Sequence, residues 1–352
     1  MFTPDRLLAL CRPGFEGDAA AELAERAAAA GSWGHARTRD GEGLLEFFPG
    51  TDPMELLLAP DFRQRVFVRQ ICATSEAAVN LPPGDRIAPL LGGLNTVVGD
   101  ALVETADGEE HRQLGRLTRQ LSGPFKGALQ ARRLLADGRP HAPRAHLVLD
   151  SGSSAWFGLS PPEVSSPHAG GMVRLRQSRD APSRSALKLE EALLTMLPPA
   201  DIHLLFGART VAVDLGAAPG GWTWALRQRG AHVIAVDNGA LAPALASDPN
   251  VEHVRADAFT FKPPAGVHWL VCDVVDKPAR VVELMARWLR RGYARRALFN
   301  LKLPMQRRWA AVVDAEKRFY RVLGDSAGDF DLSIRQLCHD REEVTCLARP
   351  RR

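Results

Sequence analysis

The feature that most constrains the fold of this chain is a glycine-rich turn directly after an apolar run. Residues 210–214 read Thr-Val-Ala-Val-Asp, the composition of a buried parallel strand. The turn that follows contains Gly216, Pro219, Gly220 and Gly221. Glycines let the backbone approach a ligand at the carboxyl end of a strand, where open α/β sheets bind their ligands. The spacing is neither that of a dinucleotide-binding turn nor that of a phosphate loop, so it favours a nucleoside ligand without a pyrophosphate.

Aspartates mark the ends of four successive expected strands. They are Asp214, Asp237, Asp257 and Asp273. A single aspartate after a strand is usually a helix cap or a turn residue. Four of them in register beside a glycine-rich turn indicate one ligand site instead. Asp237 has the position at which an acidic side chain contacts ribose hydroxyls.

Strands alternate with helices from residue 183 onward, which indicates a parallel sheet. A fifth strand is expected at 297–301 and a helix at about 309–323. The tail, 330–336 and then 344–347, has the pattern of an antiparallel hairpin. We therefore predict an α/β fold whose sheet is mostly parallel and has an antiparallel last strand.

The first 160 residues have a different pattern, without a series of βαβ units, which indicates a small α+β region. The expected elements are a helix at 17–30, strands at 43–48 and 65–71, and a hairpin over 146–159. Residues 161–182 contain four prolines, paired glycines and three arginines and are expected to form a linker. The predicted domains are thus 1–160 and 183–352, joined by 161–182.

Charge is distributed unevenly along the chain. Residues 1–110 hold 9 basic and 18 acidic residues, residues 111–160 hold 8 and 2, and residues 161–352 hold 28 and 21. The net charges are −9, +6 and +7, which sum to the overall +4. A basic middle and second half favour a polyanionic partner, although a solvated basic face has the same composition.

Composition excludes several classes of protein. With 45% hydrophobic and 24% charged residues, the chain matches ordinary globular proteins rather than disordered or fibrous ones. No apolar stretch reaches about 18 residues, and the first residues lack the pattern of a secretory signal, so we expect no membrane span. The five cysteines form no C-x-x-C pair, which favours reduced thiols in a cytoplasmic protein over a zinc site or a disulfide framework.

Several motifs together carry a family resemblance. They are Pro182-Ser-Arg-Ser-x-Leu-Lys-Leu-Glu-Glu-Ala, Asp214-Leu-Gly-x-x-Pro-Gly-Gly-Trp-Thr, Val271-Cys-Asp, Phe299-Asn-Leu-Lys-Leu-Pro-Met and Leu337-x-His-Asp-Arg-Glu-Glu-Val-Thr. They resemble a class I S-adenosylmethionine methyltransferase of the FtsJ-like type, with a Rossmann-like sheet. The fuller pattern is similar to the RlmM family, bacterial 23S rRNA cytidine 2′-O-ribose methyltransferases. For residues 1–160, where the similarity is weaker, it implies a ferredoxin-like piece and an RNA-binding THUMP region.

The resemblance also implies the residues of the site. S-adenosylmethionine would be bound by Ser185, Ala218, Pro219, Gly220, Gly221, Asp237, Asp257 and Asp273. Related ribose methyltransferases use a Lys-Asp-Lys-Glu tetrad, and the matching positions are Lys188, Asp273, Lys302 and Glu343. Glu342 is an adjacent alternative for the fourth position. The expected partner is 23S rRNA, with no membrane and no metal, and the protein is expected to be a monomer.

For a ribose methyltransferase with this tetrad, we expect Lys302 to accept the proton of the ribose hydroxyl. Only six of the 45 basic residues are lysine, and a lysine, unlike an arginine, can lose its proton when it is desolvated near a second cation. Lys188 would be that cation, while Asp273 and Glu343 would orient the two amines and also raise their pKa values.

Each of these residues also has a purely structural interpretation. Lys302 could be a surface residue at a strand end, Lys188 could pair with Glu191 one helical turn away, and Glu343 could pair with Arg341.

Two other functions are alternative hypotheses for this sequence. One is an RNA-binding or ribosome-assembly protein with a vestigial cofactor pocket, and the other is methylation of a protein or a small molecule. The intact glycine-rich turn and the two lysines disfavour the first, and the basic charge disfavours the second. A cytosine C5 methyltransferase would need a nucleophilic cysteine, but Cys272 lies within an expected strand and is interpreted as structural.

Overall fold

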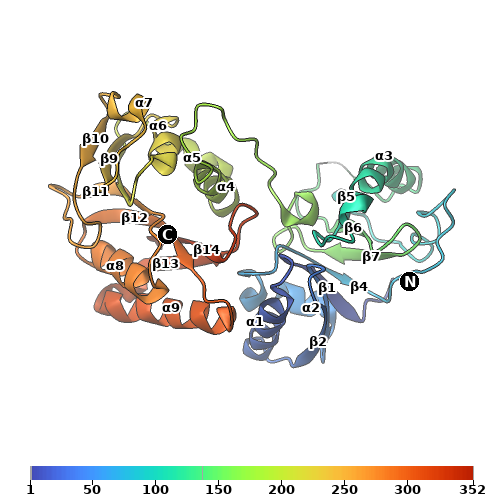
Figure 1. The fold of residues 1–352 in the computed structure, drawn as a ribbon. Helices are drawn as coiled ribbons and strands as arrows, with labels where there is room; N and C mark the ends of the chain where they lie inside the picture. The colour runs from blue at the N-terminus through green and yellow to red at the C-terminus, as the bar shows by residue number, and fades with distance from the viewer. Residues whose placement is uncertain (1, 137, 352) are drawn as a thin grey trace. The chain divides into compact units, whose positions relative to one another are not determined.

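Two seven-stranded β-sheets organise the chain (Figure 1). The computed structural model describes residues 2–136 and 138–351. It divides into two units, residues 1–172 (unit 1) and residues 173–352 (unit 2), each built on one sheet. This division falls inside the segment expected to be a linker, 161–182, and the predicted domain limits stay a prediction.

Unit 1 contains a largely antiparallel sheet in the order β2-β3-β1-β4-β7-β6-β5, in which β5 and β6 pair in parallel. Its strands are β1 (Arg6–Leu10), β2 (Gly34–Arg39), β3 (Leu44–Pro49), β4 (Gln70–Thr74), β5 (Asp100–Thr105), β6 (Arg144–Leu149) and β7 (Ala155–Ser160). Its helices are α1 (Glu16–Ala29), α2 (Pro53–Leu58) and α3 (Gly115–Ala131), with 3₁₀ turns at Pro60–Phe62, Arg112–Leu114 and Ala169–Gly171. The expected helix at 17–30, the strand at 43–48 and the hairpin over 146–159 are confirmed.

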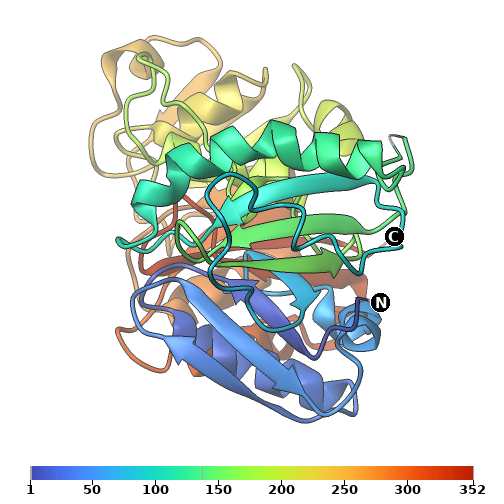
Figure 2. The same cartoon turned by 90° about the vertical axis from the view of Figure 1, so that its right-hand side faces the viewer.

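Alternating side chains of β6 and β7 contribute to apolar clusters on opposite faces of this sheet. Leu147 and Phe157 pack in one cluster with Phe125 and Leu129 of α3, which lies beside β5 (Figure 2). Trp156 belongs to the other cluster, with side chains of β1 and β3. Every residue of β6 and β7 is buried, so both faces of these two strands are covered.

The strand expected at 65–71 is wrong in its first part, because β4 begins at Gln70. The backbone N–H groups of Val66 and Phe67 donate to the carboxylate of Glu22 at 2.5 and 2.8 Å, instead of to a neighbouring strand. The guanidinium of Arg65 donates to the carbonyl oxygens of Phe62 and Val164. A buried side-chain acceptor thus replaces the strand ladder, which alternation of residue types does not reveal.

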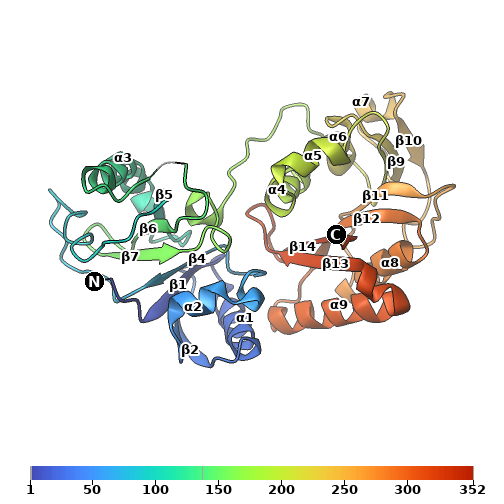
Figure 3. The same cartoon turned by 180° about the vertical axis from the view of Figure 1, so that it is seen from behind.

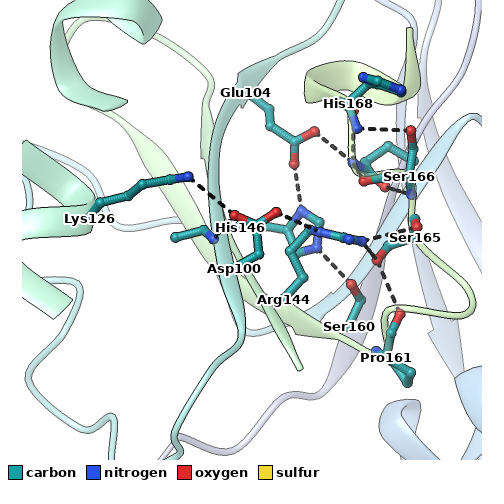
Figure 4. A network of polar contacts seen from close by, with 12 residues as sticks. Asp100, Glu104, Lys126, Arg144, His146, Ser160, Pro161, Ser165, Ser166 and His168 are labelled. Atoms are coloured by element: carbon teal, nitrogen blue, oxygen red, sulfur yellow. Dashed lines mark hydrogen bonds and ion pairs between the residues drawn. The ribbon is translucent and has the colours of Figure 1, made fainter. Parts of the chain in front are cut away.

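A buried polar network joins β5, β6 and β7 of unit 1 to the segment that follows β7 (Figure 4). His146 Nδ1 lies 2.6 Å from Glu104 Oε1, and His146 Nε2 lies 2.7 Å from Ser160 Oγ. Glu104 Oε2 accepts from Gln70 Nε2 at 2.8 Å and from the backbone of Gly170 at 2.6 Å. The order serine, histidine, glutamate is that of a hydrolytic relay, but all three side chains are buried, so no substrate reaches the serine.

The same network attaches part of the expected linker to unit 1. Gln70 bonds to the backbone of Ser166, and Arg144 donates to Ser165 O at 3.0 Å. Together with the contact of Gly170 to Glu104, these bonds hold residues 165–170 against the sheet of unit 1. This part of the expected linker is therefore a packed, irregular segment of unit 1.

Unit 2 contains the predicted parallel sheet, in the order β10-β9-β8-β11-β12-β14-β13 (Figure 3). Its strands are β8 (Val211–Leu215), β9 (His232–Val236), β10 (Val251–Val254), β11 (Val267–Cys272), β12 (Ala294–Lys302), β13 (Phe330–Arg335) and β14 (Glu343–Pro350). The strands from β10 to β12 pair in parallel. The last strand of the chain, β14, runs antiparallel between β12 and β13, so the α/β fold class and the terminal hairpin are confirmed.

Helices cover both faces of this sheet (Figures 1 and 3). They are α4 (Ala186–Met196), α5 (Pro199–Leu205), α6 (Gly221–Arg227), α7 (Pro243–Ala246), α8 (Pro278–Arg290) and α9 (Arg308–Leu323), with a 3₁₀ turn at Gly324–Asp329. On one face, Leu189 and Leu193 of α4 pack with Trp222 of α6 over Trp269 of β11. On the other face, α8 packs against α9 and against β12.

Among the helices of the described ranges, none combines the length and the apolar composition that a membrane crossing requires.

Replacement of His146 by Leu tests the buried network. We expect the free energy of unfolding to fall by about 2–4 kcal/mol, because Glu104 and Ser160 would stay buried without their partner. Urea unfolding measures the change. His141→Leu is the matched control, because the His141 side chain is 89% exposed. Equal unfolding midpoints for the two variants would contradict a stabilising role of the network.

Candidate functional site

The turn after β8 is built from glycines at positions where a side chain does not fit. Gly216 and Gly220 have φ angles of +76° and +113°, in the left-handed region that favours glycine. A Cβ atom on Gly216 would overlap the side chain of Val274, and one on Gly220 would overlap that of Leu245. The turn therefore presents bare backbone at the carboxyl end of β8.

Ser185 packs against the same turn from the start of α4. A Cβ atom on Gly221 would overlap the hydroxyl groups of Ser183 and Ser185, which lie 2.6 Å from each other. The indole nitrogen of Trp222 donates to the carbonyl oxygen of Ser185 at 3.0 Å. The predicted cofactor residue Ser185 is thus brought next to Gly221, although 36 residues separate them in the sequence.

Asp237, which follows β9, closes the other side of the turn. Its two carboxylate oxygens accept one backbone N–H each, from Ala218 at 3.0 Å and from Gly239 at 2.7 Å. A carboxylate has about four acceptor positions, so two remain for ligand hydroxyls. This arrangement fits a ribose diol beside the backbone of Ala218.

Asp257 lies in the loop after β10, at the same edge of the sheet. One of its oxygens accepts from the backbone of Phe259 at 2.9 Å, and its side chain is exposed. An exposed carboxylate with an available oxygen fits an amino group of a ligand.

Asp214 differs from the other strand-end aspartates because its side chain is buried. It is 1% exposed and accepts a hydrogen bond from the Thr223 hydroxyl at 2.7 Å. Burial raises the pKa of Asp214 to about 7, the Thr223 bond opposes this rise, and the nearby Asp273 carboxylate adds to it. Asp214 therefore acts inside the fold, where it ties β8 to α6.

The structure brings three of the four tetrad residues into direct contact. The ammonium of Lys188, on α4, lies 3.2 Å from Asp273 Oδ1 and 2.6 Å from Glu343 Oε1. Asp273 follows β11, and Glu343 begins β14. Three elements that are distant in the sequence thus meet at the carboxyl edge of the parallel strands.

Lys302, at the end of β12, completes the group. In the antiparallel pair of β12 and β14, Lys302 lies directly opposite Glu343, and its ammonium is 3.9 Å from Glu343 Oε2. The two lysines therefore share one carboxylate. They differ in exposure, because the Lys302 side chain is 40% exposed and that of Lys188 is 17% exposed.

These contacts decide between the alternatives left open by the sequence. Glu342 pairs with Arg308 at 3.0 Å, so Glu343 is the glutamate that joins the lysines. Glu191 does not pair with Lys188; its carboxylate accepts from the backbone of Cys338 and His339 and from the His339 ring.

The two carboxylates also set the protonation of Lys188. Burial lowers the pKa of the Lys188 ammonium, but the charges and hydrogen bonds of Asp273 and Glu343 outweigh burial, and the net pKa is raised. Burial raises the pKa of Asp273, with Lys188 opposing the rise and Glu343 adding to it. Lys188 therefore stays a cation within this group.

Asp273 is hydrogen-bonded to a chain of polar side chains. The sequence analysis gives these side chains no role in the site. Asn300 Nδ2 donates to Asp273 Oδ1 at 2.9 Å, and the Thr345 hydroxyl lies 2.9 Å from Asn300 Oδ1. Thr345 also lies 3.1 Å from Asp340, whose pKa is raised well above its usual value by burial. A protonated Asp340 can donate to Thr345, which leaves the single hydroxyl proton of Thr345 for Asn300. In the sequence, the only indication of this chain is that the polar residues Asn300 and Thr345 lie within otherwise apolar runs.

The interpretation of Cys272 as structural is supported, because it is 1% exposed and burial raises its pKa to about 12.

One group of potential metal ligands lies in unit 1: Glu42, His111 and Asp150. The guanidinium of Arg39 lies 2.6 Å from Asp150 Oδ1 and 3.4 Å from Glu42 Oε2, so both carboxylates already pair with a cation. The predicted absence of a metal stays a prediction.

Known protein families match three stretches of the chain: an RlmM ferredoxin-like domain at 5–72, the N-terminal domain of ribosomal RNA large subunit methyltransferase M at 85–161, and an FtsJ-like methyltransferase at 181–286. Ribosomal RNA large subunit methyltransferase M of Edwardsiella ictaluri is 42% identical over 347 residues, 97% of this chain and 93% of that protein. Its namesake from Azoarcus sp. is 41% identical over 349 residues, 98% of this chain and 96% of that protein. The chain belongs to the ribosomal RNA large subunit methyltransferase M family.

Membership of this family makes the chain a methyltransferase and confirms the resemblance predicted from the motifs. The ferredoxin-like piece is confirmed over residues 5–72, whereas the THUMP region stays a prediction. Among solved structures, TrmN from Thermus thermophilus aligns over 98% of this chain and 99% of that chain, with 14% identity and a TM-score of 0.36. A similarity of that size adds nothing to the functional argument.

The buried carboxyl of Asp214 predicts a pH dependence of stability. Since its pKa is about 7 in the fold, against an ordinary 3.8, the folded protein binds this proton more tightly, and stability falls as pH rises from about 4 to 7. Asp214→Asn removes this titration and keeps an oxygen for Thr223. Its stability relative to wild type should increase by about 2–3 kcal/mol between pH 5 and pH 8.

Chemical unfolding at the two pH values measures this difference. Asp325→Asn is the control, because Asp325 is exposed. A difference that stays constant between pH 5 and pH 8 would show that Asp214 does not titrate in this range.

Proposed function

We propose that this chain transfers a methyl group from S-adenosylmethionine to the ribose 2′-hydroxyl of a cytidine in 23S ribosomal RNA. The observation that carries the proposal is the shared carboxylate of Glu343, which holds Lys188 and Lys302 together at the edge where Asp237 and the glycine-rich turn lie. The names of the curated relatives support ribosomal RNA of the large subunit as substrate.

The residues of the turn fit S-adenosylmethionine. The free acceptor positions of Asp237 would take the ribose hydroxyls, and the available oxygen of Asp257 would take the adenine amino group. The backbone from Ala218 to Gly221, with Ser185 beside it, would contact the rest of the molecule. When bound, S-adenosylmethionine supplies a methyl group that its sulfonium already activates.

The protein must then orient the ribose hydroxyl and take its proton. Lys188 is held by two carboxylates and keeps its charge, so it supplies the fixed cation of the site. Lys302 has one carboxylate at 3.9 Å and is the more exposed lysine, so its amine is the one that a bound ribose hydroxyl can reach. Lys302 is therefore assigned as the proton acceptor.

Asp273 and Glu343 position the two amines. Asp273 is itself fixed by Asn300 at 2.9 Å. All four side chains of the tetrad come from one chain, so the site is complete in a monomer. We place the activity in the cytoplasm, where ribosomal RNA is modified.

The proposal predicts a methylated ribose that depends on Lys302. Unmodified 23S rRNA, incubated with the protein and S-adenosylmethionine labelled in the methyl group, should carry the label on a ribose after digestion to nucleosides. Lys302→Met should lower kcat by about 10²–10⁴-fold. Lys302→Arg should be similarly impaired, because an arginine keeps its charge but cannot accept the proton.

Lys317→Met, on the exposed surface of α9, is the control and should keep wild-type activity. Label on a base would contradict the ribose assignment, and an active Lys302→Arg variant would contradict the proton acceptor. Binding of RNA without any transfer, and without cofactor binding by calorimetry, would instead indicate an RNA-binding protein with a vestigial pocket.

A pair of neighbouring glutamates tests the tetrad with a matched control. Glu343→Gln should lower kcat by about 10²-fold or more, because both lysines lose the carboxylate that orients them. Glu342→Gln should have little effect, because Glu342 pairs with Arg308 and with neither lysine of the predicted tetrad. Single-turnover kinetics with saturating cofactor measures both. Equal rates for the two variants would exclude Glu343 from the site.

A further inference from the structure

Two loops at the edge of the proposed site expose apolar side chains. Among the described residues of unit 2, four large apolar side chains are strongly exposed: Leu194, Leu204, Val275 and Met305. Val275 is 77% exposed and lies two residues after Asp273, and Met305 is 72% exposed and lies three residues after Lys302. Two of these four exposed side chains, Val275 and Met305, therefore lie close in the sequence to residues of the predicted tetrad.

The two loops leave neighbouring strands in the same direction. β11 and β12 pair in parallel, with Cys272 opposite Phe299, and Asn300 reaches Asp273 directly. Residues 273–277 and 303–307 therefore both extend from the carboxyl edge of the sheet. The first loop also touches the cofactor turn, because the Val274 side chain covers Gly216.

Each loop carries a cation two residues after its apolar side chain. These are Lys277 and Arg307, and both are exposed. In the described parts of the chain, neither side chain makes a hydrogen bond or an ion pair. The nearby acids are already paired, Asp276 with Arg280 at 2.6 Å and Glu342 with Arg308 at 3.0 Å. The positive charges of Lys277 and Arg307 are therefore available to a ligand.

A nucleotide in single-stranded RNA has groups that match the apolar side chain and the cation of each loop. Its base has an apolar face, and phosphates flank its ribose on both sides. A base that is unpaired from RNA exposes this face to water, and proteins cover such bases with apolar or aromatic side chains and contact the phosphates with cations.

We propose that Val275 and Met305 cover the unpaired base of the target nucleotide, and that Lys277 and Arg307 contact its flanking phosphates. The two loops then fix the ribose between them, at the edge where Lys302 and Asp273 lie. The proposal rests on the proposed function and deepens it, because it assigns the residues that position the substrate. The target nucleotide must be presented unpaired.

Two pairs of substitutions separate base contact from phosphate contact. The double variant Val275→Ala, Met305→Ala should raise the KM for 23S rRNA on the order of tenfold, with an unchanged slope of RNA affinity against salt. Lys277→Ala and Arg307→Ala should each weaken RNA binding, and each should reduce that slope by about 0.7–0.9, the change expected for one lost phosphate contact. All variants should bind S-adenosylmethionine like wild type.

The matched controls are Leu204→Ala, an exposed apolar residue on α5, and Lys317→Ala, an exposed lysine on α9. Thermal unfolding should be unchanged, because all the substituted side chains are exposed. If wild type methylates the ribose but the loop variants match these controls, the loop proposal is wrong while the proposed function stands. If wild type does not methylate the ribose, the proposed function fails first.

Discussion

The proposed site depends on one carboxylate, that of Glu343, placed between two lysines. It lies 2.6 Å from Lys188 and 3.9 Å from Lys302. Its position follows from the insertion of β14 between β12 and β13, which sets Glu343 opposite the last residue of β12. If β14 ran elsewhere, the two lysines would lie at the same edge without the group that orients both of them.

At the proposed site, hydrogen bonds from more deeply buried residues fix the orientation of Asp273. The chain from Asp340 through Thr345 and Asn300 to Asp273 passes through buried positions. Buried polar groups are costly unless they are bonded, so such a chain fixes the orientation of each member. Unit 1 uses the same device, with His146 between Glu104 and Ser160. There the burial is complete, and the network holds the fold and performs no chemistry.

Much of unit 2 could be predicted from the sequence. The apolar runs before Asp237 and Asp273 are long enough to identify parallel strands, and the glycines after β8 identify the ligand turn. Unit 1 is less predictable, because residues 65–69 have the composition of a strand, but Val66 and Phe67 donate their backbone N–H groups to Glu22. Local alternation carries no information about an acceptor more than 40 residues away.

By itself, the sequence determined the α/β fold and the glycine-rich turn, because periodicity and short motifs are properties of neighbouring residues. The four positions of the predicted tetrad came from the family resemblance of those motifs. The tertiary structure decided which groups meet. It paired Glu343, and not Glu342, with the lysines, placed Asp214 inside the fold, and set Val275 and Met305 on adjacent loops. Strand order and register decide such contacts, and both depend on the packing of residues that lie far apart in the chain.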